Sequence, residues 1–142
     1  MTDRDYLIVE GGFTEDQADA ILAVLAGTVD DSGWRYFRRE EFRCRCGNCD
    51  TLDRLHKPMV DVLDKLRHQA GVPCVITSGV RCEAHNASPA VGGAVNSYHC
   101  RGRAADFRLQ GLSAQRSMSM IRSISNPVEL YAIDEYHVHF AI

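Results

Sequence analysis

The residues of this chain best suited to chemistry are one aspartate and three histidines in its second half. His99 stands seven residues before Asp106, and His137 and His139 stand two residues apart near the end of the sequence. Two histidines and one aspartate form a ligand set that suits catalytic zinc, because the fourth position stays open for water. A turn at residues 101–102 would bring the side chains of His99 and Asp106 to one point. The set is therefore a candidate metal site.

The third ligand is left open by spacing alone. In an extended strand, residues two apart lie on the same face, so His137 and His139 would point the same way. One of the two can then bind the metal while the other faces the substrate.

The sequence around these residues resembles that of a known enzyme family. Residues 97–106 read SYHCRGRAAD and are similar to the S-x-H-x-x-G-x-A-x-D motif of the M15 zinc peptidases, which include D-Ala-D-Ala carboxypeptidases and phage endolysins. Upstream, ITSGVRC at 76–82 resembles the SGxR strand end of the family, and HNASPAVGGA at 85–94 resembles its HN…VGGA loop. At the end, YHVH at 136–139 is similar to the strand that carries the third ligand.

The resemblance assigns roles to individual residues. It implies that His99, Asp106 and His139 bind Zn²⁺, which lowers the pKa of a bound water and polarises the scissile carbonyl. Arg81 matches the arginine that steadies the substrate carbonyl or its developing oxyanion. Ser97, two residues before the first ligand, would bind substrate.

The general base is where the sequence departs from the family pattern. Many relatives carry Glu or Asp three residues before the last ligand, but Tyr136 stands there if the ligand is His139. If His137 is the ligand, Asp134 stands at that spacing and the pattern is restored. Alternatively, His139 is the ligand, His137 assists the transition state, and Asp134 or Glu135 takes the proton.

We favour His139 as the ligand, because residues 138–140 align best with the VHVD ending of the closest branch of the family. That alignment places Ala141 where the family has an aspartate. The alternative to an active enzyme is a catalytically weakened, zinc-containing domain of the same fold that binds the cell wall or has a structural role.

The cysteines form a second unusual group. Three of the six are crowded at Cys44, Cys46 and Cys49, where FRCRCG at 42–47 resembles an F-x-C-x-C-G segment of the relatives and so implies a structural role. A second zinc needs four ligands, which Cys82 or a histidine such as His56 could complete. Free buried thiols, or one disulfide such as Cys44 to Cys82, are the other possibilities.

The composition of the chain argues against several classes of protein. The 142 residues are 45% hydrophobic and carry a net charge of −3, which provides no global positive field for nucleic acid. No stretch approaches the roughly 18 apolar residues of a membrane span, and the first residues lack the order of a secretory signal. We expect a monomer that is made in the cytoplasm and acts at the cell wall or periplasm after release, or within a virion.

The pattern of apolar residues predicts an α+β fold, with a small antiparallel sheet and flanking helices. Residues 1–33 would form a helical arm, and residues 34–142 an M15-like peptidase domain. Its substrate would be an amide bond in peptidoglycan stem peptides or crossbridges, in a phage or prophage setting. Helices are predicted over 14–27 and 113–125, and another lies somewhere between 53 and 69 with Pro58 in its first turn. Strands are predicted over 74–78 and 104–109, with a final pair within 130–142 that turns near 134–135. Residues 81–102 are predicted as a long loop.

Overall fold

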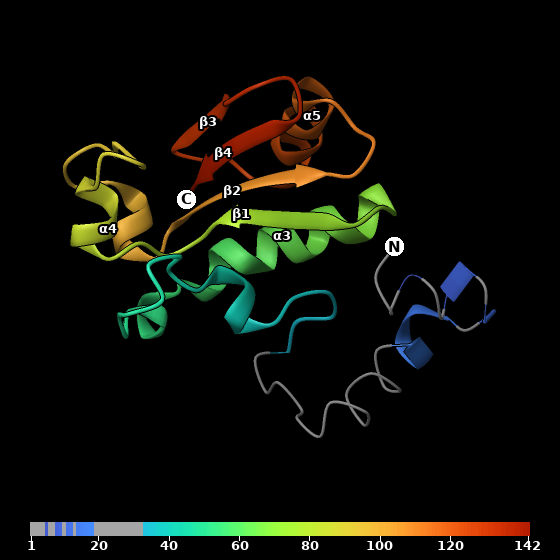
Figure 1. Cartoon of the computed structure of the whole chain (residues 1–142). Coiled ribbons are helices and arrows are strands. Elements are labelled where there is room, and N and C mark those ends of the chain that lie inside the picture. The colour runs from blue at the N-terminus through green and yellow to red at the C-terminus, as the bar shows by residue number, and fades with distance from the viewer. Residues whose placement is uncertain (1–4, 6–7, 10, 13, 19–32) are drawn as a thin grey trace.

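The computed structural model of the chain describes residues 5, 8–9, 11–12, 14–18 and 33–142. Its regular elements from residue 33 onward are shown in Figure 1. The α-helices are α3 (Lys57–Ala70), α4 (Glu83–Ala87) and α5 (Ala114–Ile124), and the strands are β1 (Cys74–Ser78), β2 (Ala104–Leu109), β3 (Glu129–Ala132) and β4 (His137–Ala141). Short 3-10 helices form η1 (Arg39–Phe42), η2 (Leu52–Arg54) and η3 (Tyr98–Arg101).

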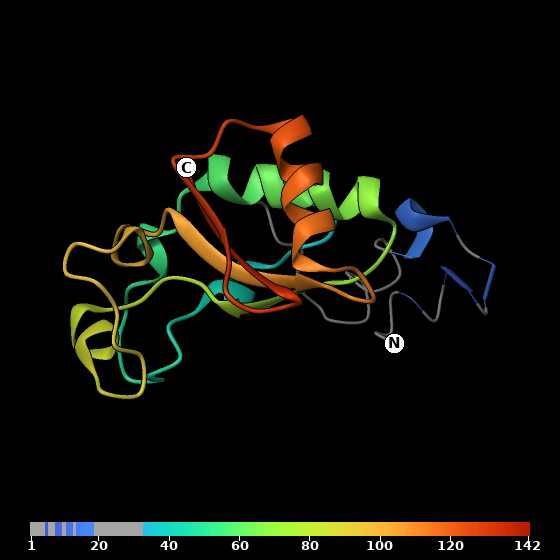
Figure 2. The same cartoon turned by 90° about the horizontal axis from the view of Figure 1, so that it is seen from above.

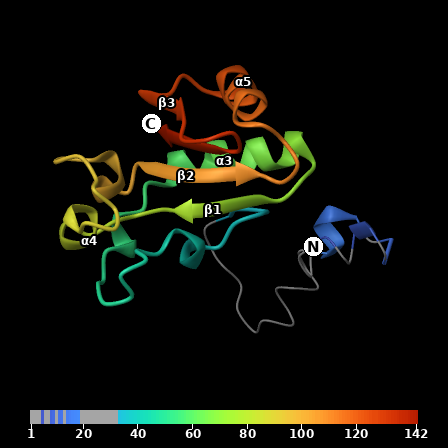
Figure 3. The ribbon, with the colours of Figure 1, turned by 45° about the horizontal axis from the view of Figure 1, so that its top comes forward.

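The four strands form one antiparallel sheet in the order β1-β2-β4-β3. Helices α3 and α5 pack against one another on one face of this sheet (Figures 2 and 3). The predicted α+β class, with a small antiparallel sheet and flanking helices, is confirmed. Among the described residues, no helix has the length and apolar character needed to cross a membrane.

Helix α3 is amphipathic, and its apolar stripe supplies much of the core. Met59, Leu63 and Leu66 are fully buried, and Pro58 lies in the first turn, where its missing N–H costs no hydrogen bond. The helix begins at Lys57, within the predicted range, and residues 52–54 before it form the separate turn η2. In α5, Met118 and Ile121 face the core as expected.

Alternation along the strands divides the sheet into two faces. Phe107 on β2 and Val138 and Phe140 on β4 are completely buried in the core cluster beneath the helices. Asp106, which precedes Phe107, and His139, which lies between Val138 and Phe140, therefore point to the opposite face of the sheet. The face away from α3 and α5 is therefore the place where polar side chains can gather.

The prediction of a structureless loop over residues 81–102 is wrong in two places. Residues 83–87 form α4 and residues 98–101 form η3, each begun by a side-chain cap. The Cys82 sulfur accepts from the backbone N–H of His85 at 3.4 Å, and the Ser97 hydroxyl accepts from that of His99 at 3.2 Å. Single turns of this kind are too short to show a hydrophobic period, so only their caps could have revealed them.

The predicted amino-terminal helix falls mostly outside the described residues. Its start agrees with the prediction: residues 15–18 are helical, and Thr14 and Gln17 exchange hydrogen bonds between side chain and backbone at 3.0 and 3.2 Å. Residues 19–27 of that helix lie outside the described range, as does most of the turn at 28–33. The domain boundary at residues 33–34 stays a prediction.

One glycine allows two segments of the chain to pack closely against each other. Gly102, which ends η3, has a φ of +69°, and a Cβ there would lie 2.0 Å from the backbone oxygen of Arg54. Its carbonyl accepts a hydrogen bond from the His56 N–H at 2.9 Å. The two segments can come this close because residue 102 has no side chain.

Replacing Gly102 with alanine should therefore destabilise the protein by clearly more than the cost of a left-handed backbone. Gly111→Ala is the matched control, since Gly111 has a φ of +80° but open space around it. That control should lose about 1–2 kcal/mol of unfolding free energy. Urea unfolding of both variants measures the difference, and equal losses would contradict the proposed clash.

Candidate metal centre

The carboxylate of Asp106 lies at the centre of a buried polar cluster. Its Oδ1 is 3.1 Å from Nε2 of His99 and 2.8 Å from Nδ1 of His139. One ligand atom from each of these three residues lies within 4.8 Å of the others. All three are buried, with 1%, 9% and 5% of the surface of His99, Asp106 and His139 exposed. Burial of three polar side chains costs free energy unless each has a partner within the protein or a bound ligand.

Three elements bring these side chains together. Strand pairing places Asp106 of β2 directly opposite His139 of β4. His99 comes from η3, whose backbone carbonyl accepts a hydrogen bond from the N–H of Arg81 at 3.0 Å. The turn after η3 returns the chain to β2, which is how two residues separated by seven positions meet.

The hydrogen bonds of His99 leave one of its nitrogens for a cation. Its Nδ1 donates to the carbonyl oxygen of Gly79 at 2.8 Å, since a carbonyl can only accept. In the neutral ring, Nε2 then carries a lone pair that faces the Asp106 carboxylate. Two such acceptors face each other stably only with a proton or a metal ion between them. The donor set therefore fits a metal ion.

His139 is held between two carboxylates. Its Nδ1 faces Asp106, and its Nε2 donates to Oε1 of Glu129 at 2.9 Å. The ring of Tyr131 stacks on it, with centroids 4.5 Å apart and an angle of 17° between the planes. A carboxylate on the far nitrogen is the usual partner of a metal-binding histidine, because it fixes the tautomer and the ring.

Glu129 and Tyr131 are not among the residues that the sequence pointed to. Both lie on β3, where period-2 alternation places them on the same face, and Tyr131 pairs with His139 across the β3–β4 register. The signal that could have found them is the alternation of a strand that starts at residue 129. It becomes informative only when the pairing of β3 with β4 is known.

The electrostatics of the cluster favour a charged carboxylate. Burial acts to raise the pKa of Asp106, but the hydrogen bonds from His139 and His99 outweigh it, so the pKa lies well below the usual range. Burial acts to lower the pKa of His139, but the hydrogen bonds to Asp106 and Glu129 outweigh it and raise that pKa. A metal ion at Nδ1 of His139 would displace a proton that these carboxylates stabilise.

Arg81 extends the cluster on the other side of Asp106. Its three nitrogens donate to Oδ2 of Asp106 at 3.2 Å, to Oδ1 of Asn86 at 3.1 Å and to the hydroxyl of Ser78 at 3.0 Å. The Asn86 amide also donates to the carbonyl of Ala94 at 2.9 Å. Asn86 thus links the arginine to the loop that leads to Ser97.

A cavity of about 550 Å³ opens over the cluster. Of the predicted site residues, the cavity brings together Arg81, Ser97, His99, Asp106 and His139, and Glu129 and Tyr131 also line it. The remaining wall comes from residues 91–96, Tyr98 and residues 132–133.

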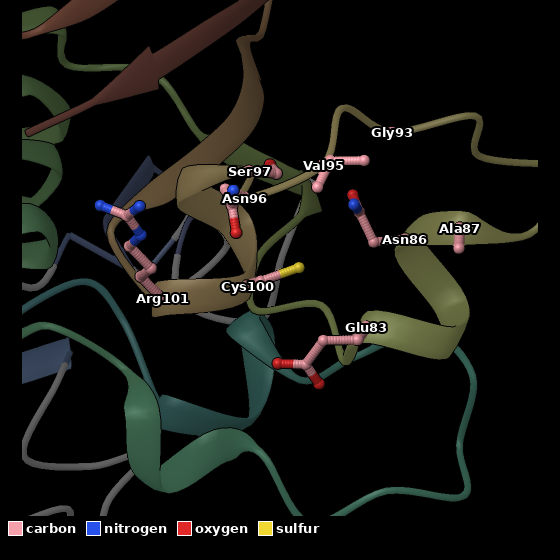
Figure 4. A pocket seen from close by; sticks show the side chains of 9 residues that line it. All are labelled: Glu83, Asn86, Ala87, Gly93, Val95, Asn96, Ser97, Cys100 and Arg101. Carbon is pink, nitrogen blue, oxygen red and sulfur yellow. The ribbon is translucent and has the colours of Figure 1, made fainter.

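A smaller hollow of about 330 Å³ is lined by residues of α4, of the segment 93–97 and of η3 (Figure 4). Ser97 lines both spaces. In Figure 4 the Cys100 sulfur points into the space between η3 and α4, whereas Arg101 points away from it. Cys100 lines this hollow and is not among the residues that line the cavity over the metal cluster, although it follows His99 in sequence.

Asp134 and His137 are not among the residues that line the cavity over the metal cluster. The Asp134 carboxylate accepts from Nδ1 of His137 at 2.9 Å and from the backbone N–H of Tyr136 and His137. The N–H of Tyr136, followed by the His137 side chain, lowers the pKa of Asp134 to about 2. His137 shares its strand face with His139 as expected, two residues closer to the turn between β3 and β4. The catalytic role of the two residues stays a prediction.

Two histidines and a carboxylate that meet beneath an open cavity are a donor set that fits a metal-dependent hydrolase. The chain belongs to the family described as Peptidase M15, which matches residues 35–141. The resemblance noted in the sequence is thereby confirmed, and the family implies a metallopeptidase. Neither the curated proteins nor the solved structures include a match to this chain.

The two neighbouring histidines of β4 provide a direct test of the ligand set. We expect His139→Ala to abolish binding of the metal at this centre, because Nδ1 of His139 faces Asp106. His137→Ala, the matched control, should retain it, because His137 pairs with Asp134 instead. Isothermal titration with Zn²⁺ measures both. Loss of the metal in the His137 variant alone would reverse the assignment.

Proposed function

We propose that this chain is a zinc-dependent peptidase that hydrolyses an amide bond in peptidoglycan stem peptides or crossbridges. The observation that carries the proposal is the meeting of His99 and His139 at one oxygen of Asp106, in a chain of the M15 peptidase family. The metal is assigned as zinc because two imidazoles and one carboxylate form the donor set of catalytic zinc. When bound, zinc makes a water nucleophilic near neutral pH and polarises the scissile carbonyl.

Arg81 is the residue proposed to hold the substrate carbonyl. An arginine has five N–H donors, and the three hydrogen bonds of Arg81 within the protein leave others free. Its side chain is 13% exposed and lines the cavity. A cation fixed in this way stabilises negative charge that develops on the carbonyl oxygen without having to reorganise.

Ser97 is the residue proposed to orient the substrate. Its oxygen accepts from the N–H of His99 at 3.2 Å, so the hydroxyl proton can be donated to a peptide carbonyl. It lies on the cavity wall beside Arg81. The two residues together could align a peptide over the Asp106 cluster.

Glu129 is our first candidate for the general base. Asp106 and Glu129 are the two carboxylates among the described residues that line the cavity. Of the two oxygens of Glu129, Oε1 accepts the hydrogen bond from His139. The Glu129 side chain is 41% exposed, so water can reach it. The Asp134–His137 pair, which the family pattern suggested, is the alternative; it would have to act from the turn between β3 and β4.

The second candidate function is a zinc-containing cell-wall-binding or structural domain with weakened catalysis. Tyr136 at the position of the family acid, and the absence of Asp134 and His137 from the cavity lining, favour it. For the enzyme and for the binding domain, the proposed partner is peptidoglycan at the cell wall. We also propose that the protein is a monomer of phage or prophage origin.

Purified protein should release new amino termini from peptidoglycan, and EDTA should abolish the release. Mass spectrometry of the digest measures the activity and identifies the bond that is cut. Walls of different crossbridge chemistry serve as the comparison. Retention of zinc without cleavage of any of them would contradict the enzyme and favour the binding domain.

Substitution of the two candidate bases separates them. Glu129→Gln keeps an oxygen that can accept from His139, so it should retain zinc but lower kcat by about 10²–10⁴-fold and remove the acidic limb of the pH profile. Asp134→Asn is the matched control and should change kcat little. The opposite result would transfer the role to Asp134, and an unchanged kcat in both variants would exclude both.

A further inference from the structure

The cysteines that were crowded in sequence acquire a fourth member in the fold. Cys44, Cys46 and Cys49 lie on the segment after η1, and Cys82 reaches them from the end of the segment that follows β1. The sulfur of Cys82 is 3.9 Å from that of Cys44 and 3.9 Å from that of Cys46. The four sulfurs of this four-cysteine cluster all lie within 4.8 Å of one another.

These separations fit a shared metal ion and do not fit disulfides. A zinc ion at about 2.3 Å from each of four tetrahedral sulfurs places neighbouring sulfurs about 3.8 Å apart. A disulfide needs about 2.05 Å. All four cysteines are free in the structure. The pairs at 3.9 Å are therefore already close to the spacing of a tetrahedral sulfur site.

Backbone N–H groups point at three of the sulfurs. The N–H of Cys82 donates to the Cys44 sulfur at 3.4 Å, that of Asn48 to Cys46 at 3.3 Å, and that of His85 to Cys82 at 3.4 Å. Donors arranged in this way stabilise negative charge on sulfur, which is the state that binds a metal.

We propose that Cys44, Cys46, Cys49 and Cys82 bind a structural zinc ion, separate from the His99–Asp106–His139 centre. Four thiolates fill a tetrahedral shell and leave no position for water, so this site serves stability and not catalysis. Thiolate ligands select zinc over the harder divalent cations.

The four-cysteine cluster would act as a clamp beside the substrate-binding arginine. Cys82 directly follows Arg81 and caps α4, which carries Asn86, the partner of Arg81. Two hydrogen bonds join the 42–50 segment to residues shortly before Cys82. The N–H of Val80 donates to the Phe42 carbonyl at 2.8 Å, and Arg45 donates to the Ile76 carbonyl of β1 at 3.0 Å. A bound zinc would lock the 42–50 segment to the 78–86 segment and so hold Arg81 in place.

The test counts metal ions in the full chain by native mass spectrometry after zinc loading. The wild-type protein should bind about two zinc ions, one at each centre. Cys49→Ser should lose one of them, whereas Cys100→Ser, a free cysteine outside the cluster, should keep both. His139→Ala should also lose one, and should keep the ion bound by cysteine. The two losses are independent, so failure of one assignment does not imply failure of the other.

Cobalt substitution gives a second readout that does not depend on the stability of a variant. Wild-type protein loaded with Co²⁺ should show thiolate-to-cobalt charge-transfer absorption, and His139→Ala should retain it. Cys49→Ser should weaken it, since one of four thiolates is removed. Absence of this absorption in the wild type, a disulfide found by alkylation of the unreduced unfolded chain, or iron in place of zinc would each overturn the proposal.

Discussion

The structure depends on the hydrogen bonds and ion pairs that stabilise one buried carboxylate, that of Asp106. Asp106 lies in the central strand pair with 9% of its surface exposed, and its two oxygens face His99, His139 and Arg81. An isolated charge at this depth would cost several kcal/mol. The partners come from η3, β4 and the segment after β1, so each of these must be in register for the charge to be tolerated. Removal of any partner would leave the carboxylate under-satisfied, which makes the site and the fold interdependent.

The two faces of the sheet separate stability from chemistry. Helices α3 and α5 and the residues of the core cluster cover one face, which leaves the other free for Asp106, His139, Glu129 and Tyr131. Since strands alternate, a rigid apolar layer directly beneath the site holds its side chains in place. The remaining partners, Arg81 and Ser97, come from connecting segments that are fixed by short helices and by hydrogen bonds through Asn86.

What the sequence could predict follows from how local each signal is. The strands at 74–78 and 104–109 have local signals in the sequence and are confirmed. The motif that carries His99 and Asp106 is also local. Glu129 and Tyr131 depend on the register between β3 and β4, which no local pattern specifies. Cys82 was one of two suggested fourth members of the cysteine cluster, and only the packing of η1 against β1 distinguishes it from His56. The helices α4 and η3 escape prediction because helices of one turn are too short to show a periodic pattern of hydrophobic residues.

Anomalous diffraction at the zinc edge, on crystals of the full chain grown with zinc, tests the account most directly. The account predicts a peak at about 2.0–2.2 Å from Nε2 of His99, an oxygen of Asp106 and Nδ1 of His139. Nε2 of His139 should still donate to Glu129. A structure that shows no peak there, with Nδ1 of His139 still hydrogen-bonded to Asp106 in the presence of zinc, would contradict it.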